Sequence, residues 1–266
     1  MLKRIYKENE VNFALIWIVI YVVIMNIALN YCGGFDNLAS NTIDQLLVPV
    51  ICILLIAIML TIWIVKNKLS KKYGICKVNG KLKNFLWFIP LIIMSCINMK
   101  NGLELPAPII ISLLMMLNMM IAGYVEEIIF RGFLFKGMAK DNLKVAILVS
   151  SLTFGVGHIV NIFNTSDILG VLLQVCYATS IGFLYTIIFY KSGSLWPNII
   201  SHAFVNGTSV FASEYGPFSS LINLIFGSSS QSLVEIISAL IIIIISSSYA
   251  LWLYKKNVVY EMHPLK

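Results

Sequence analysis

The sequence predicts an all-α protein, a polytopic membrane bundle of about eight transmembrane helices, and three observations lead to this fold class. Of the 266 residues, 59% are apolar and only 12% are charged. The mean hydropathy, +0.89, lies far above that of water-soluble domains. Apolar runs of about 20 residues, the length that crosses a bilayer as a helix, recur along the whole chain. We therefore expect one integral membrane domain over residues 1–266.

The expected spans follow the apolar runs, with polar segments between them. They cover residues 11–31, 45–65, 84–98, 107–135, 145–163, 168–190, 195–212 and 233–254. The first run follows the basic start "MLKRIYKENE", but it is longer than the apolar stretch of a secretory signal, and no A-x-A-like cleavage site follows it. We therefore expect this run to be retained as a membrane anchor.

The basic residues predict the orientation of the bundle. If the N-terminus is cytoplasmic, 17 of the 19 lysine and arginine residues fall in cytoplasmic segments, as the positive-inside rule requires. Lys100 is then the one basic residue outside, and Arg131 lies in the membrane. Both termini are therefore expected in the cytoplasm. The net charge of +7 belongs to that face, where membrane lipid is the expected partner, and nothing beyond charge supports nucleic-acid binding.

The fourth expected span carries three charges in "YVEEIIFRG", residues 124–132. Each buried charge costs about 2.5–3.5 kcal/mol at the centre of a membrane helix, so the three must be paired or functional. Glu127 and Arg131 are four residues apart and share one helical face, where they can neutralise each other. Glu126 lies about 100° around the helix from Glu127 and needs a different partner.

Two histidines are expected inside the membrane at a similar depth to Glu126. His158 lies in the fifth expected span and His202 in the seventh. Counting from the basic ends of the spans puts all three groups in one layer, roughly 10–20 Å from the cytoplasmic edge. Phe154 precedes His158 by four residues and can shield it from lipid, and Asn206 follows His202 by four. The layer predicts a small water-filled cavity.

Each feature alone has an ordinary structural explanation, but their coincidence predicts a functional site. The pair Glu127 and Arg131 is suited to positioning the helix, and a single intramembrane histidine often bonds a neighbouring helix. Together they match peptide hydrolysis, which needs a base for water and donors for the oxyanion. The sequence has no H-E-x-x-H, no pair of intramembrane aspartates and no plausible G-x-S-x-G elbow. A glutamate base assisted by two histidines remains.

These residues resemble the CPBP intramembrane peptidases, also called the Abi or CAAX-protease and bacteriocin-processing family. The family motifs E-E-x-x-x-R, F-x-x-x-H and H-x-x-x-N match "EEIIFR" from Glu126, "FGVGH" ending at His158 and "HAFVN" from His202. The motifs occur in the family order, and the resemblance covers the catalytic core at about 115–210. It implies a glutamic endopeptidase of eight helices whose site opens toward the cytoplasm.

The resemblance also implies a role for each motif residue. Glu126 and His158 would polarise the attacking water, and His202 with Asn206 would stabilise the oxyanion. Glu127, Arg131 and Phe154 would be supporting residues. The expected substrate is a membrane-associated peptide or membrane protein, for example a bacteriocin or signalling-peptide precursor in a bacterial plasma membrane, with self-immunity as a related role.

The resemblance favours a reaction without a cofactor. If the reaction were metal-dependent, Glu126, His158 and His202 would be the three zinc ligands, with an open position for water. No acid would then remain as the base, because Glu127 is engaged by Arg131. We therefore expect no metal at this site.

Two functions from other classes stay open. A proton-coupled transporter would use the same acid and histidines as a relay, although no internal repeat of the transporter kind is visible. A non-catalytic membrane scaffold or immunity protein would bind a toxin, although a scaffold has no need of a buried unpaired acid. Neither the substrate nor the oligomeric state follows from the sequence.

Overall fold

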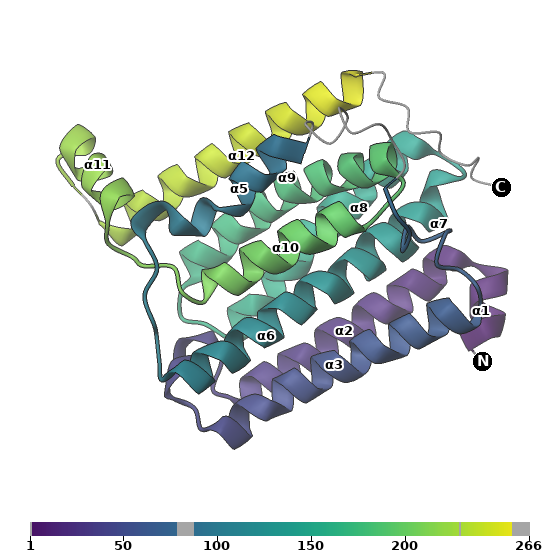
Figure 1. Ribbon diagram of the computed structural model, residues 1–266, viewed down its shortest axis with the longest axis horizontal. Helices are drawn as coiled ribbons and strands as arrows, with labels where there is room; N and C mark the ends of the chain where they lie inside the picture. Colours follow the sequence, from purple (N-terminus) through teal and green to yellow (C-terminus); the bar gives the residue numbers. More distant parts are fainter. Residues whose placement is uncertain (1, 79–87, 229, 257–266) are drawn as a thin grey trace.

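The computed structural model describes residues 2–78, 88–228 and 230–256, and over these ranges the protein is a helical bundle (Figure 1). The described residues contain no strand, only an isolated bridge between Leu103 and Ala212. The predicted all-α membrane fold is thereby confirmed.

Six helices among the described residues are long and apolar enough to cross a membrane. They are α2 (Glu10–Tyr31), α3 (Ile43–Lys66), the continuous run of α6 (Ile109–Glu126), the π-helix η4 (Glu127–Phe135) and α7 (Lys136–Ala139), then α8 (Leu143–Gly157) with η5 (His158–Phe163), α9 (Ile168–Ser192) and α12 (Gln231–Lys255). Their bounds lie within four residues of the corresponding predicted spans, so six of these spans correspond to membrane-length helices.

The other two expected spans do not correspond to membrane-length helices among the described residues. In place of 195–212 the structure has α10 (Trp196–Ser209), of 14 residues. In place of 84–98 it has α5 (Ile89–Ser95) and η3 (Ile97–Asn101), and the start of that span lies outside the described residues. The count of eight membrane spans therefore stays a prediction. Three short helices were not expected: α1 (Leu2–Glu8), η1 (Phe35–Ser40) and α11 (Pro217–Phe226).

Side-chain caps fix where several long helices begin. Asn9 accepts from two backbone N–H groups at the start of α2, and Thr42 forms a capping box with Gln45 at the start of α3. Asn142 and Asp167 cap α8 and α9 in the same way. These caps satisfy backbone donors that no helical carbonyl can reach.

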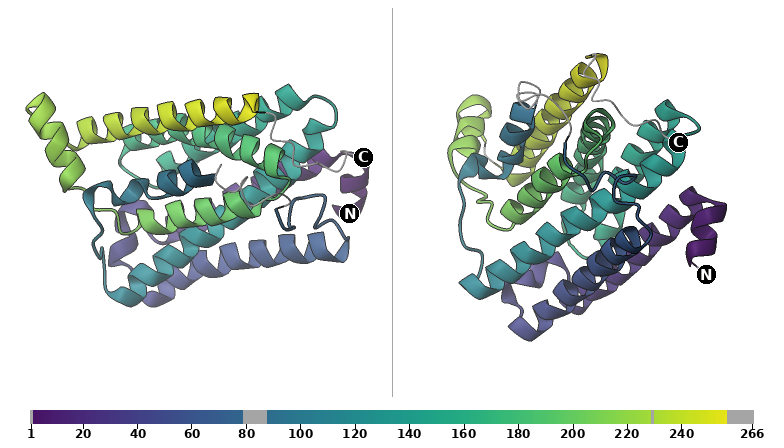
Figure 2. Two further views of the ribbon diagram at one scale, coloured as in Figure 1. Left: turned by 45° about the horizontal axis from the view of Figure 1, so that its top comes forward. Right: turned by 45° about the vertical axis from the view of Figure 1, so that its right-hand side comes forward.

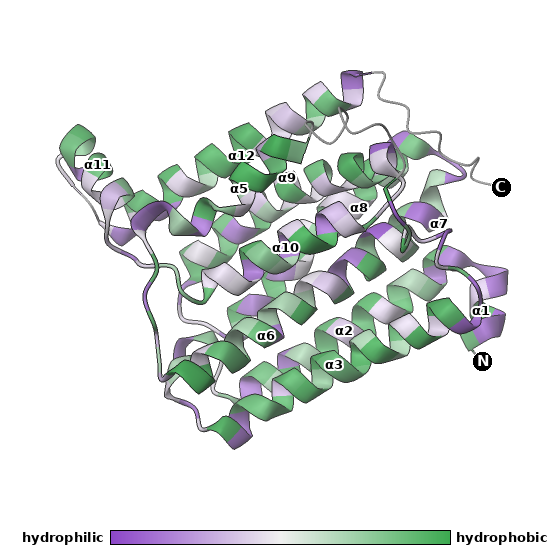
Figure 3. Ribbon diagram, in the orientation of Figure 1, coloured by the Kyte–Doolittle hydropathy of each residue, from purple (hydrophilic) through white to green (hydrophobic). Residues whose placement is uncertain are grey.

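The basic segments meet at one end of the bundle. Lys72 and Lys140 both lie against Glu10, with N–O distances of 2.7 and 3.7 Å. Lys191 donates to the backbone oxygen of Lys256 at 2.8 Å. Figure 3 shows polar residues gathered at this end, around α1 and α7. The shared end agrees with the predicted topology, while the side of the membrane that this end faces stays a prediction.

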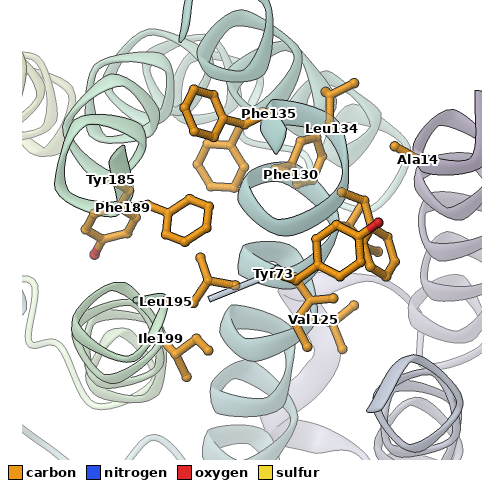
Figure 4. Close-up of a cluster of buried hydrophobic side chains, with 14 of the residues drawn as sticks. Ala14, Tyr73, Val125, Phe130, Leu134, Phe135, Tyr185, Phe189, Leu195 and Ile199 are labelled. Atoms are coloured by element: carbon orange, nitrogen blue, oxygen red, sulfur yellow. The ribbon is translucent and has the colours of Figure 1, made fainter. Parts of the chain in front are cut away.

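The π-helix η4 runs through the centre of the core. All of its residues are buried, and Figure 4 shows Phe130, Leu134 and Phe135 among side chains of neighbouring elements, including Phe189 and Leu195. The Phe135 and Phe189 rings meet edge to face at 6.0 Å. A charged residue on this helix is therefore enclosed by protein on every side.

Two glycines allow the backbones of neighbouring helices around the site to approach closely. Figure 2 shows the bundle of these helices from two further sides. A Cβ at Gly155 of α8 would lie 2.7 Å from the backbone oxygen of Val175 in α9. A Cβ at Gly123 of α6 would lie 3.0 Å from the backbone nitrogen of Ala203 in α10. Small residues at such crossings let membrane helices pack tightly. The second approach brings the end of α6 beside His202.

Candidate active site

A buried ion pair lies at the centre of the site. Arg131 Nη1 donates to Glu127 Oε1 at 2.9 Å, and both side chains are fully buried. The guanidinium also lies over the Phe154 ring, 4.1 Å from its centroid. The pairing predicted from the four-residue spacing is confirmed.

Glu127 has more partners than the sequence analysis assigned to it. His202 Nδ1 lies 2.9 Å from Glu127 Oε1, and Asn198 Nδ2 donates to Oε2 at 3.1 Å. Because a carboxylate can only accept, the hydrogen of this contact is on the Nδ1 atom of His202. Glu127 therefore orients the imidazole as well as neutralising Arg131.

His202 also connects the two adjacent acids. Its Nε2 atom lies 3.4 Å from Glu126 Oε2, while its Nδ1 atom contacts Glu127. Glu126 is the last residue of α6 and Glu127 is the first of the π-helix, so the two acids lie where the helical geometry changes. π-Helical turns of this kind are frequent at functional sites.

Glu126 has one anchored and one free oxygen. Oε1 accepts a hydrogen bond from the Tyr21 hydroxyl at 2.5 Å. Oε2 has no hydrogen-bond partner within the described ranges, although it is buried. Glu126 thus differs from Glu127, as predicted, in having no arginine bonded to it. Its partner Tyr21 belongs to α2, where the sequence analysis assigned no site residue.

His158 lies where α8 ends and η5 begins. Its Nδ1 atom is 2.9 Å from the backbone oxygen of Phe154, which can only accept, so Nδ1 carries the hydrogen. The Nε2 lone pair of the neutral ring is then left for the cavity that His158 lines. The Phe154 ring meets His158 edge to face at 5.0 Å and His202 at 5.6 Å. The predicted contact of Phe154 with His158 is confirmed.

Two cavities meet at these residues. The smaller, of about 130 Å³, is lined by Tyr21, Glu126, His158 and Asn206, among others. It has room for several water molecules. The larger, of about 510 Å³, is lined by His202 and has the size of a ligand pocket. Phe154, His158 and Asn206 line both, so they form the wall between the cavities.

The larger cavity runs away from the basic end of the bundle. Its lining reaches Asn101, Asp167, Glu214 and Gln231, which lie at helix ends and loops. Asp167 and Gln231 begin α9 and α12, whose other ends carry Lys191 and Lys255. The family resemblance implied a site opening toward the basic, cytoplasmic end, and neither of the two cavities opens that way.

A loop after α2 closes part of the far end. Phe35 of η1 lines both cavities, and its backbone N–H donates to the Asn164 oxygen at 2.6 Å. The next residue, Asp36, accepts hydrogen bonds from the Thr165 hydroxyl and from the backbone and side chain of Ser166. These donors, that of Thr165 first, lower the pKa of Asp36. The loop is therefore held against the segment that follows His158.

The metal alternative can be compared with the donors present. Over the described ranges, no three histidine, cysteine, aspartate or glutamate side chains form a group that could hold an ion. Glu126 and His202 lie close to each other, whereas His158 only lines the same cavity as Glu126. Whether the protein needs a metal stays untested.

The segment that carries the motif residues matches a known protein family. Residues 107–208 match the family described as type II CAAX prenyl endopeptidase Rce1-like. The matched segment contains every motif residue from Glu126 to Asn206, so the resemblance is confirmed, and the fold and family support an intramembrane protease of the CAAX type. The match covers about two fifths of the chain, the segment that carries the motifs, and shows what this segment is similar to. A comparison with curated proteins finds no match.

Two residues of the network were missed from sequence. Asn198 has a signal, because it precedes His202 by four residues just as Asn206 follows it by four, so the three share one face of α10. Tyr21 has no such signal, since 105 positions separate it from Glu126 and only the packing of α2 brings them together.

The buried pair leads to a stability prediction. Arg131→Gln leaves the Glu127 carboxylate enclosed without its cation, so we expect the free energy of unfolding to fall by about 3–5 kcal/mol. The melting temperature of the purified protein in detergent measures the loss. Glu127→Gln combined with Arg131→Gln removes both charges and should recover much of it. A double variant no more stable than Arg131→Gln would contradict the assignment.

Proposed function

We propose that this protein is an intramembrane endopeptidase in which Glu126 activates water to hydrolyse a peptide bond of a membrane-associated peptide or protein. One observation carries the proposal: the free oxygen of Glu126 adjoins a water-sized cavity that shares a wall with a ligand-sized one. Water and substrate can therefore approach the same residues from two sides. The family match over residues 107–208 supports the reaction class.

The reaction begins at Glu126. Its free Oε2 atom takes a proton from a water molecule as the water oxygen bonds to the scissile carbonyl carbon. The Nε2 lone pair of His158 accepts the second hydrogen of that water and orients it. When the tetrahedral intermediate collapses, the carbon–nitrogen bond breaks and Glu126 returns its proton to the departing amine. No covalent bond to the enzyme forms.

Two side chains are placed to stabilise the oxyanion: Asn206 in the wall between the cavities and His202 in the lining of the larger cavity. The Asn206 amide can donate to it without any change in charge. His202 carries its hydrogen on Nδ1, toward Glu127, so donation from Nε2 requires the doubly protonated ring. Glu127 and Arg131 act through His202 by fixing the plane of the ring.

The reaction proposed here uses no metal. If Glu126 were a zinc ligand, the remaining acid would have to act as the base. That acid, Glu127, is occupied by Arg131, Asn198 and His202. The proposal therefore keeps Glu126 as the base and predicts no role for zinc.

The biological role proposed is the maturation of a bacteriocin or signalling peptide, or self-immunity to such a peptide, in a bacterial plasma membrane. Both roles require a substrate that reaches a site buried between helices and surrounded by lipid. The peptide class is proposed from the family resemblance.

A cleavage assay tests the reaction. The protein is co-expressed with peptide precursors, and the products are identified by mass spectrometry. Glu126→Gln preserves the shape of the side chain and removes the base, so we expect cleavage to fall by about 10²–10⁴-fold. His158→Ala should also lose cleavage, whereas Glu8→Gln, in α1 and in the lining of neither cavity, should keep it.

The variants must be compared at equal membrane levels. Cleavage by Glu126→Gln at the wild-type rate would refute the glutamate mechanism. A protective phenotype that persists in Glu126→Gln without any cleavage would instead favour the scaffold or immunity function.

The direction of the larger cavity leads to a second proposal, that the substrate enters from the end opposite the basic segments. If the basic end is cytoplasmic, this entrance faces the outer side of the membrane. Gln174 of α9 lines the cavity between its mouth and the histidines, whereas Leu172 at nearly the same depth is exposed and lines neither cavity.

Cysteine labelling tests this route. In a protein whose five native cysteines are replaced, Gln174→Cys should react with a charged, membrane-impermeant methanethiosulfonate added outside intact cells. Only a thiol in water ionises to the reactive thiolate, so Leu172→Cys in lipid should not react. Reaction of Gln174→Cys only when the reagent reaches the cytoplasmic side would contradict the proposed entrance.

A further inference from the structure

We infer that Tyr21 is a positioning residue of this site, which holds one oxygen of Glu126 so that the other is presented to water. The inference rests on the proposed function for its catalytic consequence, and on the contact itself for the geometry. Tyr21 lies in α2, outside the matched segment 107–208.

The contact is short and specific. The Tyr21 hydroxyl donates to Glu126 Oε1 at 2.5 Å, the length of a charge-assisted bond between an O–H donor and a carboxylate. Glu126 Oε2, two bonds away, has no such partner and lies 3.4 Å from His202 Nε2. A carboxylate fixed through one oxygen cannot rotate freely, so the same oxygen always faces the reacting water.

The α2 helix is anchored where this role requires. Asn26 and Asn30, four residues apart on α2, donate to the backbone oxygens of Val160 and Phe163 at 3.2 Å. Both oxygens belong to η5, the turn that begins at His158. Tyr21 and His158 also line the same small cavity. The helix that carries the tyrosine is thus tied to the segment that carries the histidine.

In a purely structural role, the Tyr21 hydroxyl would only form a hydrogen bond between two helices, as other side chains in the bundle do. Tyr124 provides the comparison, because it lies two residues from Glu126 and bonds Thr61 of α3 at 2.6 Å. Both tyrosines join an N-terminal helix to α6, but only Tyr21 bonds an acid. Tyr124→Phe is therefore the matched control for Tyr21→Phe.

Steady-state cleavage distinguishes the two roles. Tyr21→Phe removes only the hydroxyl, so we expect kcat to fall by roughly 10-fold or more while KM changes by less than about 3-fold. Tyr124→Phe should leave both constants near wild type. Melting temperatures of the two variants should be similar, because each loses one interhelical bond. Equal effects of the two substitutions on kcat would overturn the inference.

A second measurement does not depend on cleavage. Dicyclohexylcarbodiimide enters membranes and adds to protonated carboxyl groups, and mass spectrometry locates the adduct. The Tyr21 hydroxyl occupies Glu126 Oε1, and its loss frees that oxygen for the reagent, so Glu126 should be labelled roughly 10-fold faster in Tyr21→Phe. Tyr124→Phe should match wild type. Faster labelling in a protein that cleaves no peptide would support the contact and refute the proposed function, whereas unchanged labelling would overturn the inference.

Discussion

The site depends on the neutralisation of charge inside a closed helical core. Arg131 and Glu127 lie on a π-helix whose every residue is buried, where an uncompensated charge would be expensive. The ion pair between them lets the helix hold charged side chains at the centre of the bundle. Once Glu127 is ionised and fixed, it can hold the Nδ1 atom of His202, and the second acid, Glu126, is left at the wall of a cavity. The catalytic proposal follows from this difference in surroundings between the two adjacent acids.

The two cavities explain why the site needs several helices. Glu126 from α6 adjoins the small cavity, His202 from α10 lines the larger one, and His158 at the end of α8 belongs to both. Close crossings at Gly123 and Gly155 make this convergence possible. The α2 helix adds Tyr21 from outside the segment that matches the family. The N-terminal part of the chain therefore contributes a residue to the candidate site.

Local periodicity predicted much of this site, and long-range packing accounts for what it missed. The spacing of four residues predicted the bond between Glu127 and Arg131 and the contact of Phe154 with His158. It did not predict that one imidazole contacts both acids, because that depends on the crossing of α6 and α10. Hydropathy predicted the bounds of six membrane-length helices to within four residues. It overestimated the segment at 195–212, where the structure has a 14-residue helix, α10, with His202 buried between its neighbours.

The central claim is that Glu126 activates water without bonding to the substrate, and the origin of the product oxygen tests it most directly. A single turnover with enzyme in excess is run in water enriched in oxygen-18, using a peptide that the protein cleaves. We predict that the new carboxyl terminus carries oxygen-18 in this first turnover, because solvent attacks the carbonyl carbon. An unlabelled product would contradict this, since it would mean that a carboxyl oxygen of the protein had been transferred to the peptide.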